Sequence, residues 1–505
     1  MSEAIRPGFR IVILGGGTAG WMAANLLAAR WPQADISVVE ATDIGIIGVG
    51  EGSTPQLKAF FDGLGVAETD WMPACNATYK NGISFHGWSD RPGHSSYFHP
   101  FPAPIDVHTS PAFFFHSHYR RHGYDLNADP DRFFLSAWLA RHGKAPIPAE
   151  NFPFEMAYGY HFDAYRVGAF LRDHARTLGV GHIEARIAAA VLAETGDIAA
   201  LKADDGREIA GDFFIDSSGF RSALLQETLK VKFRSFADNL FNDAAIVMPT
   251  PPDPARTNSH TRATAMKHGW AWDIPLTNRS GNGYVYASRY VTADEAETEL
   301  RAHLGLLDSD VEARRLTMRV GRVEAPWRRN CLAVGLSQGF IEPLEATALH
   351  LVQATVEGFM TAFEKGGATN AEERAFNAEI NARFEGVRDY IVCHYRANLR
   401  GDTAYWRDNA ANDALSDSLR RILACWFSRG DMKREIADQG VAKYYSLTSW
   451  LCLLGGYGNY PRADGLAPPP PELRRFEMAK IDDFIRRCAY NFRDHKSVLA
   501  AMTAG

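Results

Sequence analysis

The chain has few cysteines, and their spacing excludes the usual cysteine-based sites. Six cysteines are scattered over 505 residues without a Cys-x-x-Cys pair, which argues against a structural zinc site and against a redox dithiol. In a long chain without an export signal, free thiols in a reducing compartment are the expected state. We therefore expect a cytoplasmic protein with no metal site.

An excess of one charge and long apolar runs are also absent. The 54 basic and 60 acidic side chains leave a formal net charge of -6, which offers no general attraction to nucleic acid or to an anionic membrane. No apolar stretch approaches the length that crosses a bilayer, and the first residues carry no signal-peptide pattern. We expect neither nucleic acid nor a membrane as a partner.

A glycine-rich turn near the N-terminus is the clearest motif that is present. The apolar run Ile11 to Leu14 leads into Gly15-x-Gly17-x-x-Gly20 and then into a helical pattern. In dinucleotide-binding folds these glycines allow a tight turn, the close approach of a pyrophosphate and the packing of the helix on its strand. A second strand pattern ends at Glu40, where a carboxylate binds a ribose hydroxyl. A turn without a ligand is the weaker alternative, and the motif does not distinguish FAD from NAD.

The remaining patterns predict an α/β fold. We expect a doubly wound, Rossmann-like FAD-binding module over residues 1–370, with added β-sheet, and a mainly helical, substrate-covering region over 371–505, the two packing as one compact unit. Residues 92–154 are rich in aromatic side chains but have no clean periodicity, so they read as an irregular insertion that contributes to a substrate pocket or packs under a long loop. The patterns predict helices at about 163–178, 348–363 and 473–491, and strands at 78–88, 187–192, 199–203, 212–216, 269–275 and 331–335. They also predict an amphipathic helical stripe through Phe376, Ile380, Phe384, Val387 and Ile391.

Several residues have two readings on these patterns alone. Lys80, at the start of a strand pattern, reads by itself as a surface lysine. Trp270 and Trp272 fall on the same side of a strand and are either core residues or the wall of a cofactor site. The glycine-rich stretch Gly45 to Pro55 is either a loop that closes over a cofactor or a simple connection into a helix.

Together these pieces resemble the flavin-dependent halogenases, in particular the tryptophan halogenase group. Trp270-x-Trp272-x-Ile274-Pro275 matches the W-x-W-x-I-P signature of the family, and Gly48 to Pro55 looks like its flavin strap. The resemblance implies Lys80 and Glu345 as catalytic residues. It also implies a halide site at Thr347 and Ala348 and a tunnel lined by Trp270 and Trp272. The implied substrate pocket contains His99, Phe101, Tyr444, Tyr445 and Trp450. The implied FAD contacts are Gly15, Gly17, Thr18, Ala19, Gly20, Glu40, Gly50, Ile187 and Leu336.

The resemblance also implies a mechanism and partners. FADH2, supplied by a separate flavin reductase, and O2 would convert chloride or bromide to hypohalous acid. Lys80 would then hold this acid or become a haloamine, and Glu345 would stabilise the cationic ring intermediate and take its proton. A homodimer is one option for the oligomeric state.

Two departures from the family pattern concern specificity. Ala346-Thr347-Ala348 replaces the Ser-Thr-Gly that family members commonly have, and a methyl group at Ala348 is expected to restrict the backbone at the halide. The acid expected after Tyr444-Tyr445, which would hold the ammonium of tryptophan, is missing, and an unpaired ammonium in an apolar wall is costly.

The leading hypothesis is therefore a halogenase of indole or a substituted indole rather than of free tryptophan. The alternatives are a flavin-dependent aromatic hydroxylase and, less favoured, a flavin-binding protein without catalysis.

Overall fold

Two units, each assembled from three separate stretches of the chain, make up the protein. The computed structural model describes residues 5–41, 50–253, 258–463 and 465–503. The first unit contains Met1–Asn76, Phe162–Ala237 and Arg319–Glu385, and the second contains Ala77–His161, Asp238–Met318 and Gly386–Gly505. This division cuts across the boundary expected at residue 370, because residues 371–385 belong to the first unit.

A parallel sheet forms the centre of the first unit. Strand β1 pairs in parallel with β2 on one side and with β13 on the other, and β13 pairs in parallel with β22. This arrangement confirms the predicted doubly wound sheet. In spatial order the strands are β21 (Trp327–Arg328), β22 (Cys331–Ala333), β13 (Phe213–Asp216), β1 (Arg10–Leu14), β2 (Asp35–Glu40) and β9 (Gly181–Glu184).

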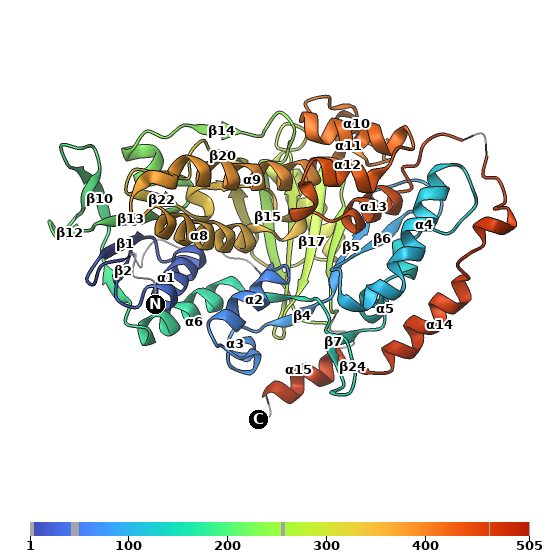
Figure 1. Ribbon diagram of the computed structural model, residues 1–505, viewed down its shortest axis with the longest axis horizontal. Coiled ribbons are helices and arrows are strands. Elements are labelled where there is room, and N and C mark those ends of the chain that lie inside the picture. Colours follow the sequence, from blue (N-terminus) through green and yellow to red (C-terminus); the bar gives the residue numbers. More distant parts are fainter. Residues whose placement is uncertain (1–4, 42–49, 254–257, 464, 504–505) are drawn as a thin grey trace. The chain divides into compact units, whose positions relative to one another are not determined.

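Helix α1 (Thr18–Arg30) packs against α6 (Ala164–Thr177) and α8 (Ala348–Lys365) in the same unit (Figure 1). The buried amide of Asn25 joins α1 to α6, because its Nδ2 donates to the carbonyl oxygen of Leu171 at 2.8 Å. The side chain of Asp163 caps α6 by accepting from two backbone N–H groups, so the predicted helix start is confirmed.

Smaller elements complete the first unit. The π-helix η4 follows the 3₁₀ turn η3 directly after β13, and two three-stranded sheets lie outside the central one. These elements are α2 (Gln56–Gly63), α3 (Glu68–Ala74), β3 (Gly50–Gly52), β10 (Ile187–Leu192), β11 (Ile198–Ala203), β12 (Glu208–Ala210), η3 (Gly219–Arg221), η4 (Ala223–Thr228), β14 (Phe233–Ser235), β20 (Gly321–Val323), β23 (Gly339–Phe340), η5 (Gly335–Ser337), η6 (Pro343–Glu345) and η7 (Asn370–Glu372).

A seven-stranded sheet organises the second unit. Its strands are antiparallel to their neighbours except for β16 and β5, which run parallel. The strand predicted over 269–275 is confirmed as β17. In spatial order the strands are β19 (Arg314–Thr317), β15 (Ala244–Thr250), β18 (Ser280–Tyr286), β17 (Gly269–Pro275), β16 (Thr261–Ala265), β5 (Gly82–His86) and β6 (Ser96–Pro100).

The expectation of an irregular insertion at residues 92–154 was wrong. This segment contains β6, α4 (Ser110–Arg121), α5 (Leu135–Arg141) and β7 (Lys144–Pro148). The buried face of α4 includes Phe113 together with His116 and Ser117. Because two of these side chains are polar, a search for apolar residues at helical spacing does not detect this buried face.

The C-terminal region is helical, as predicted. Helix α9 (Glu373–Arg396) buries the predicted stripe from Phe376 to Ile391. The final predicted helix, 473–491, is observed as a shorter helix, α14. Of α9 and of β8 (Gly159–Asp163), residues 386–396 and 159–161 belong to the second unit. Its other elements are β4 (Thr78–Lys80), η1 (Pro104–His108), η2 (Pro130–Arg132), α7 (Ala293–Leu304), α10 (Ala404–Ala411), α11 (Asp417–Phe427), α12 (Met432–Asp438), η8 (Val441–Lys443), α13 (Leu447–Gly456), η9 (Pro471–Leu473), α14 (Met478–Ala489), β24 (Phe492–Asp494) and α15 (His495–Thr503).

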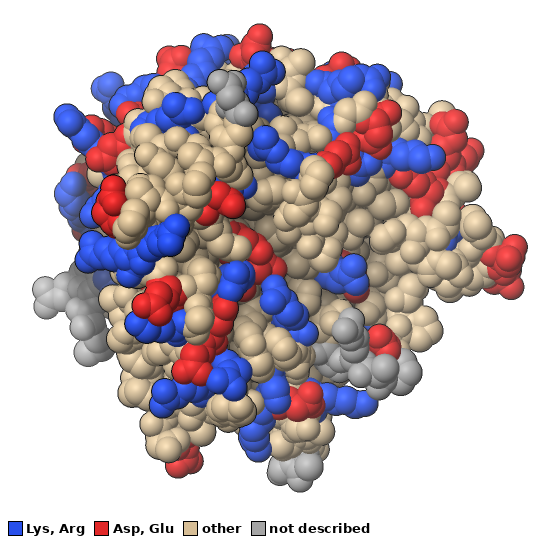
Figure 2. Space-filling model, turned by 90° about the vertical axis from the view of Figure 1, so that its right-hand side faces the viewer, with Lys and Arg blue, Asp and Glu red and all other residues tan. Residues whose placement is uncertain are grey.

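The surface mixes both charges. On the face drawn in Figure 2, basic and acidic side chains are interspersed and neither sign predominates, in keeping with the small net charge of -6. Among the helices within the described residues, none is both long and apolar enough to cross a membrane.

Candidate active site

The glycine turn closes tightly against the end of the neighbouring strand β13. Gly15 has a φ of +114°, and a Cβ added there would lie 2.2 Å from the carbonyl oxygen of Ser217. A Cβ on Gly20 would lie 2.0 Å from the carbonyl oxygen of Gly15. Both positions therefore exclude a side chain, as expected where a strand turns into a nucleotide-binding helix.

The start of α1 is shaped to receive an anion. Gly17 is the extended N-cap residue and has no side chain that could occupy the first turn, so the N–H groups at this positive helix end stay accessible to a phosphate. A Cβ on Gly335, the first residue of η5 after β22, would lie 2.7 Å from the Cβ of Ala19. Leu336 therefore follows a glycine that lies directly against the helix start. These features fit the pyrophosphate of FAD.

Glu40 lies over this turn at the end of β2. Its Oε1 is 2.7 Å from Nε2 of His182 on β9, and its Oε2 occupies the space that a Cβ on Gly16 would need. The carboxylate is thus held beside the turn, where it is suited to a ribose hydroxyl. Sequence reasoning missed His182, because pairing of β2 with the distant β9 leaves no local signal.

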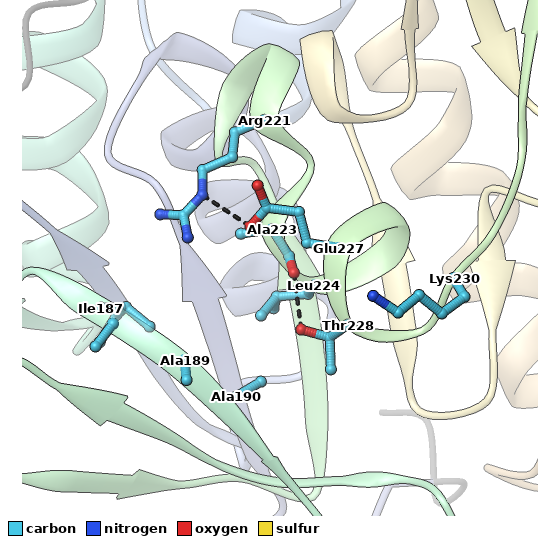
Figure 3. A pocket seen from close by; sticks show the side chains of 10 residues that line it. Ile187, Ala189, Ala190, Arg221, Ala223, Leu224, Glu227, Thr228 and Lys230 are labelled. Atoms are coloured by element: carbon cyan, nitrogen blue, oxygen red, sulfur yellow. Dashed lines mark hydrogen bonds and ion pairs between the residues drawn. The ribbon is translucent and has the colours of Figure 1, made fainter.

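Ile187 lines a cavity of about 350 Å³ in the first unit. Figure 3 shows Ile187, Ala189 and Ala190 on one wall and η3 and η4 on the other. At its rim, Nε of Arg221 is 2.9 Å from a carboxylate oxygen of Glu227. The cavity mixes an apolar floor with charged groups at its edge.

The predicted flavin strap is only partly described. Residues 45–49 lie outside the described residues, while Gly50 belongs to the short strand β3. Helix α2 begins directly after Pro55, which confirms the predicted helix start.

The halide residues lie at the start of α8. Glu345 is 4% exposed and Thr347 is 7% exposed, and Thr347 is the N-cap residue, although its side chain caps no backbone N–H. The left-handed conformation falls on Ala346, with a φ of +54°. Ala348 is the first residue of the regular helix. Alanine adopts helical angles without strain, and the effect of its methyl group on the halide stays a prediction.

Lys80 is fully buried in the second unit, which excludes the reading as a surface lysine. Its exposed fraction is 0%, and its Nζ lies 5.7 Å from the ring centroid of Phe101, within the range of a cation–π contact. Strand β4 carries Lys80 and pairs antiparallel with β8.

A buried histidine, His161, lies on the strand paired with β4, and sequence reasoning missed it. The His161 ring lies between the hydroxyls of Thr78 and Thr261, at 3.0 Å and 2.9 Å. Burial, followed by the charge of Lys80 and the nearby His495 and His260, holds the pKa of His161 well below its ordinary value.

Four of the five predicted substrate residues form an aromatic cluster against α9 around Tyr390, whereas Phe101 lies beside Lys80. Nε2 of His99 is 3.1 Å from the hydroxyl of Tyr390, and the ring of Tyr445 stacks on Tyr390 at 3.6 Å. Trp450 meets the same ring edge-on at 4.9 Å. Tyr444 fills the space over Gly386 in α9. Sequence reasoning missed Tyr390, which the helical stripe of α9 marks only as a core position.

The tryptophan pair shares a sheet face with His99. The rings of Trp270 and Trp272 lie 6.1 Å apart, and the strand register places His99, Thr261 and Trp272 on the same face. The predicted pocket and tunnel residues thus all belong to the second unit. The glycine turn, Glu345 and the halide residues belong to the first unit.

Comparisons with known proteins agree with this combination of features. The family model for tryptophan halogenase matches residues 10–467. The chain is 35% identical to 7-chloro-L-tryptophan 6-halogenase KtzR of Kutzneria sp. (strain 744), over 97% of this chain and 99% of that protein. It is 33% identical to tryptophan 7-halogenase RebH of Lentzea aerocolonigenes, over 93% of this chain and 92% of that protein.

A solved structure shows the same fold. BrvH, a flavin-dependent halogenase from Brevundimonas sp. BAL3, superposes with a TM-score of 0.83 at 33% identity, covering 98% of this chain and 99% of that one. Since the related proteins are enzymes, the alternative of a flavin-binding protein without catalysis is set aside. The chain belongs to the tryptophan halogenase family of flavin-dependent enzymes.

Proposed function

We propose that this enzyme halogenates indole or a substituted indole, with FADH2 delivered by a separate flavin reductase and with chloride or bromide as the halide. The observation that carries the proposal is the burial of Lys80 beside Phe101, in the same unit as the aromatic cluster of His99, Tyr390 and Trp450. A buried amine next to a site for a flat aromatic ring is suited to transferring an electrophile to that ring.

Separate groups of residues bind the cofactor, position the halogen and accept the proton. The turn from Gly15 to Gly20 and the carboxylate of Glu40 hold the cofactor. When bound there, FADH2 would activate O2, which is the oxidant that converts halide to hypohalous acid. Lys80 either donates a hydrogen bond to this acid or exchanges a proton for its halogen. The aromatic carbon then forms a bond to the halogen and loses a proton to Glu345, while the hypohalous oxygen leaves as water.

Indole is favoured over free tryptophan because of the chemistry of α13. This helix follows Tyr444 and Tyr445, is almost entirely buried and carries no carboxylate. An ammonium group placed against it would lose its hydration without gaining an opposite charge from this helix, which is costly.

The test compares indole with L-tryptophan under identical conditions. The enzyme, FAD, NADH and a flavin reductase are incubated with each substrate and with chloride or bromide, and products are identified by mass. We expect halogenated indole and at least about tenfold lower kcat/KM for tryptophan. A product that gains oxygen without halogen would instead favour the hydroxylase alternative.

Two further elements of the proposal have their own measurements. Replacing the reductase and NADH with chemically reduced FAD under air should still give product, because FADH2 reaches the enzyme by diffusion. A requirement for the reductase protein itself would contradict this. A homodimer predicts a molar mass near twice the 55.9 kDa of the chain in sedimentation equilibrium.

Halide preference is tested at the start of α8. We expect that Ala348→Gly changes the ratio of bromination to chlorination by less than about threefold, because Ala348 already has helical angles. Competition between equal concentrations of the two halides measures this ratio. A larger change would show that the methyl group itself contacts the halide.

A further inference from the structure

The imidazole of His161 is fixed by a chain of hydrogen bonds whose direction can be assigned. Oγ1 of Thr78 lies 2.7 Å from the carbonyl oxygen of Pro275. A carbonyl oxygen only accepts, so the single hydroxyl proton of Thr78 is donated to it. Because Thr78 has no second proton, Nδ1 of His161, 3.0 Å away, must be the donor in the contact between them.

The other ring nitrogen accepts. Nε2 of His161 is 2.9 Å from Oγ1 of Thr261, and the ring is fully buried. The positive charge of Lys80 on the neighbouring strand β4 further lowers the pKa of this imidazole. His161 is therefore neutral, with its proton on Nδ1 and the hydroxyl of Thr261 donating to Nε2.

The groups that face His161 from other elements are also basic. They are His495 at the start of α15 and His260 just before β16, in addition to Lys80. Nε2 of His495 accepts the backbone N–H of Tyr79, the residue before Lys80, at 3.1 Å. A nitrogen that accepts carries no proton, so His495 is also neutral in this arrangement.

We propose that His161 is a positioning residue for Lys80. Held uncharged between Thr78 and Thr261, it fixes strand β4 on β8 and brings no second positive charge to the Lys80 amine. A cationic imidazole at this place would repel an ammonium at Lys80 and shift its protonation. This role rests on the proposed function, in which Lys80 hands the halogen to the substrate.

The direct test is the tautomer of His161 in the wild-type protein. Nuclear magnetic resonance of ¹⁵N-histidine-labelled enzyme, with His161→Asn to assign the signal, should show a neutral Nδ1–H imidazole that does not titrate between about pH 6 and pH 8. An Nε2–H tautomer, or a titration in this range, would overturn the proposal. This measurement needs no halogenation, so it stays informative if the proposed reaction fails.

Matched substitutions at Thr261 separate positioning from packing. Thr261→Val keeps the volume but removes the hydroxyl, and we expect kcat to fall about tenfold while KM for the aromatic stays within about twofold. The acid limb of the pH profile should move to higher pH, because Nε2 loses its donor. Thr261→Ser, which keeps the hydroxyl, should restore most of kcat. If Ser is as damaging as Val, or the pH profile does not move, His161 is only a packing residue.

Discussion

The buried carboxyl of Asp106 allows a prediction of how stability depends on pH. Asp106 lies on η1, is 7% exposed, and accepts the backbone N–H of Ala103 at 2.8 Å. Burial raises its pKa from 3.8 to about 7. The folded protein therefore holds this proton more tightly than the unfolded chain. The resulting stability is fully present below pH 3.8 and is lost as the pH rises through about 7.

The magnitude follows from the pKa. One pKa unit corresponds to about 1.4 kcal/mol, so raising the pH from 5 to 8 removes about 3 kcal/mol of stability through this carboxyl alone. Asn at this position does not titrate, and its Oδ1 still accepts the N–H of Ala103. The free energy of unfolding of Asp106→Asn, relative to wild type, should therefore rise by about 3 kcal/mol between these two pH values.

Urea unfolding at pH 5 and pH 8, followed by tryptophan fluorescence, measures this difference. All other titrating groups are shared by the two proteins and cancel in the comparison. The control is Asp62→Asn, which breaks an exposed pair with Lys58 worth no more than about 1 kcal/mol. An equal difference between Asp106→Asn and wild type at both pH values would refute the reasoning.

Two other predictions concern the first unit. Gly20→Ala places a Cβ 2.0 Å from the carbonyl oxygen of Gly15. The affinity for FAD, measured by fluorescence titration, should therefore fall by at least about tenfold. The control is Gly63→Ala, where a Cβ meets nothing within 4 Å, and this variant should bind FAD as wild type does. Asn25→Leu removes the hydrogen bonds of this amide to the carbonyl of Leu171 and to Nδ1 of His174 on α6. Thermal unfolding should therefore show a lower Tm, reflecting a loss of about 2 kcal/mol, and an unchanged Tm would contradict the bridging role of the amide.

The fold was predictable where the information is local. Glycine positions and the apolar run before them define β1, the turn and α1. The order of the seven-stranded sheet was not predictable, because β16 pairs with β5 across about 180 residues of sequence. The insertion around α4 was misread because a buried histidine and serine interrupt its apolar face.

The site was predictable only in part, for the same physical reason. A lysine in a sequence looks like a surface residue, and the burial of Lys80 depends on strands that are distant in the chain. His161, His182 and Tyr390 act through contacts with residues far away in sequence, so local patterns could not identify them. The resemblance to the family identified Lys80 and Glu345 as candidate catalytic residues, whereas the burial and the neighbours of these residues come from the structure.

The most direct test of the central claim is the halogenation rate of Lys80→Met. Methionine fills the buried space without an amine, and Lys202→Met, at an exposed position on β11, is the control. We expect Lys80→Met to lose halogenation of indole by at least about a hundredfold while it still binds FAD and reoxidises FADH2. Halogenation by Lys80→Met at the rate of wild type would contradict the account.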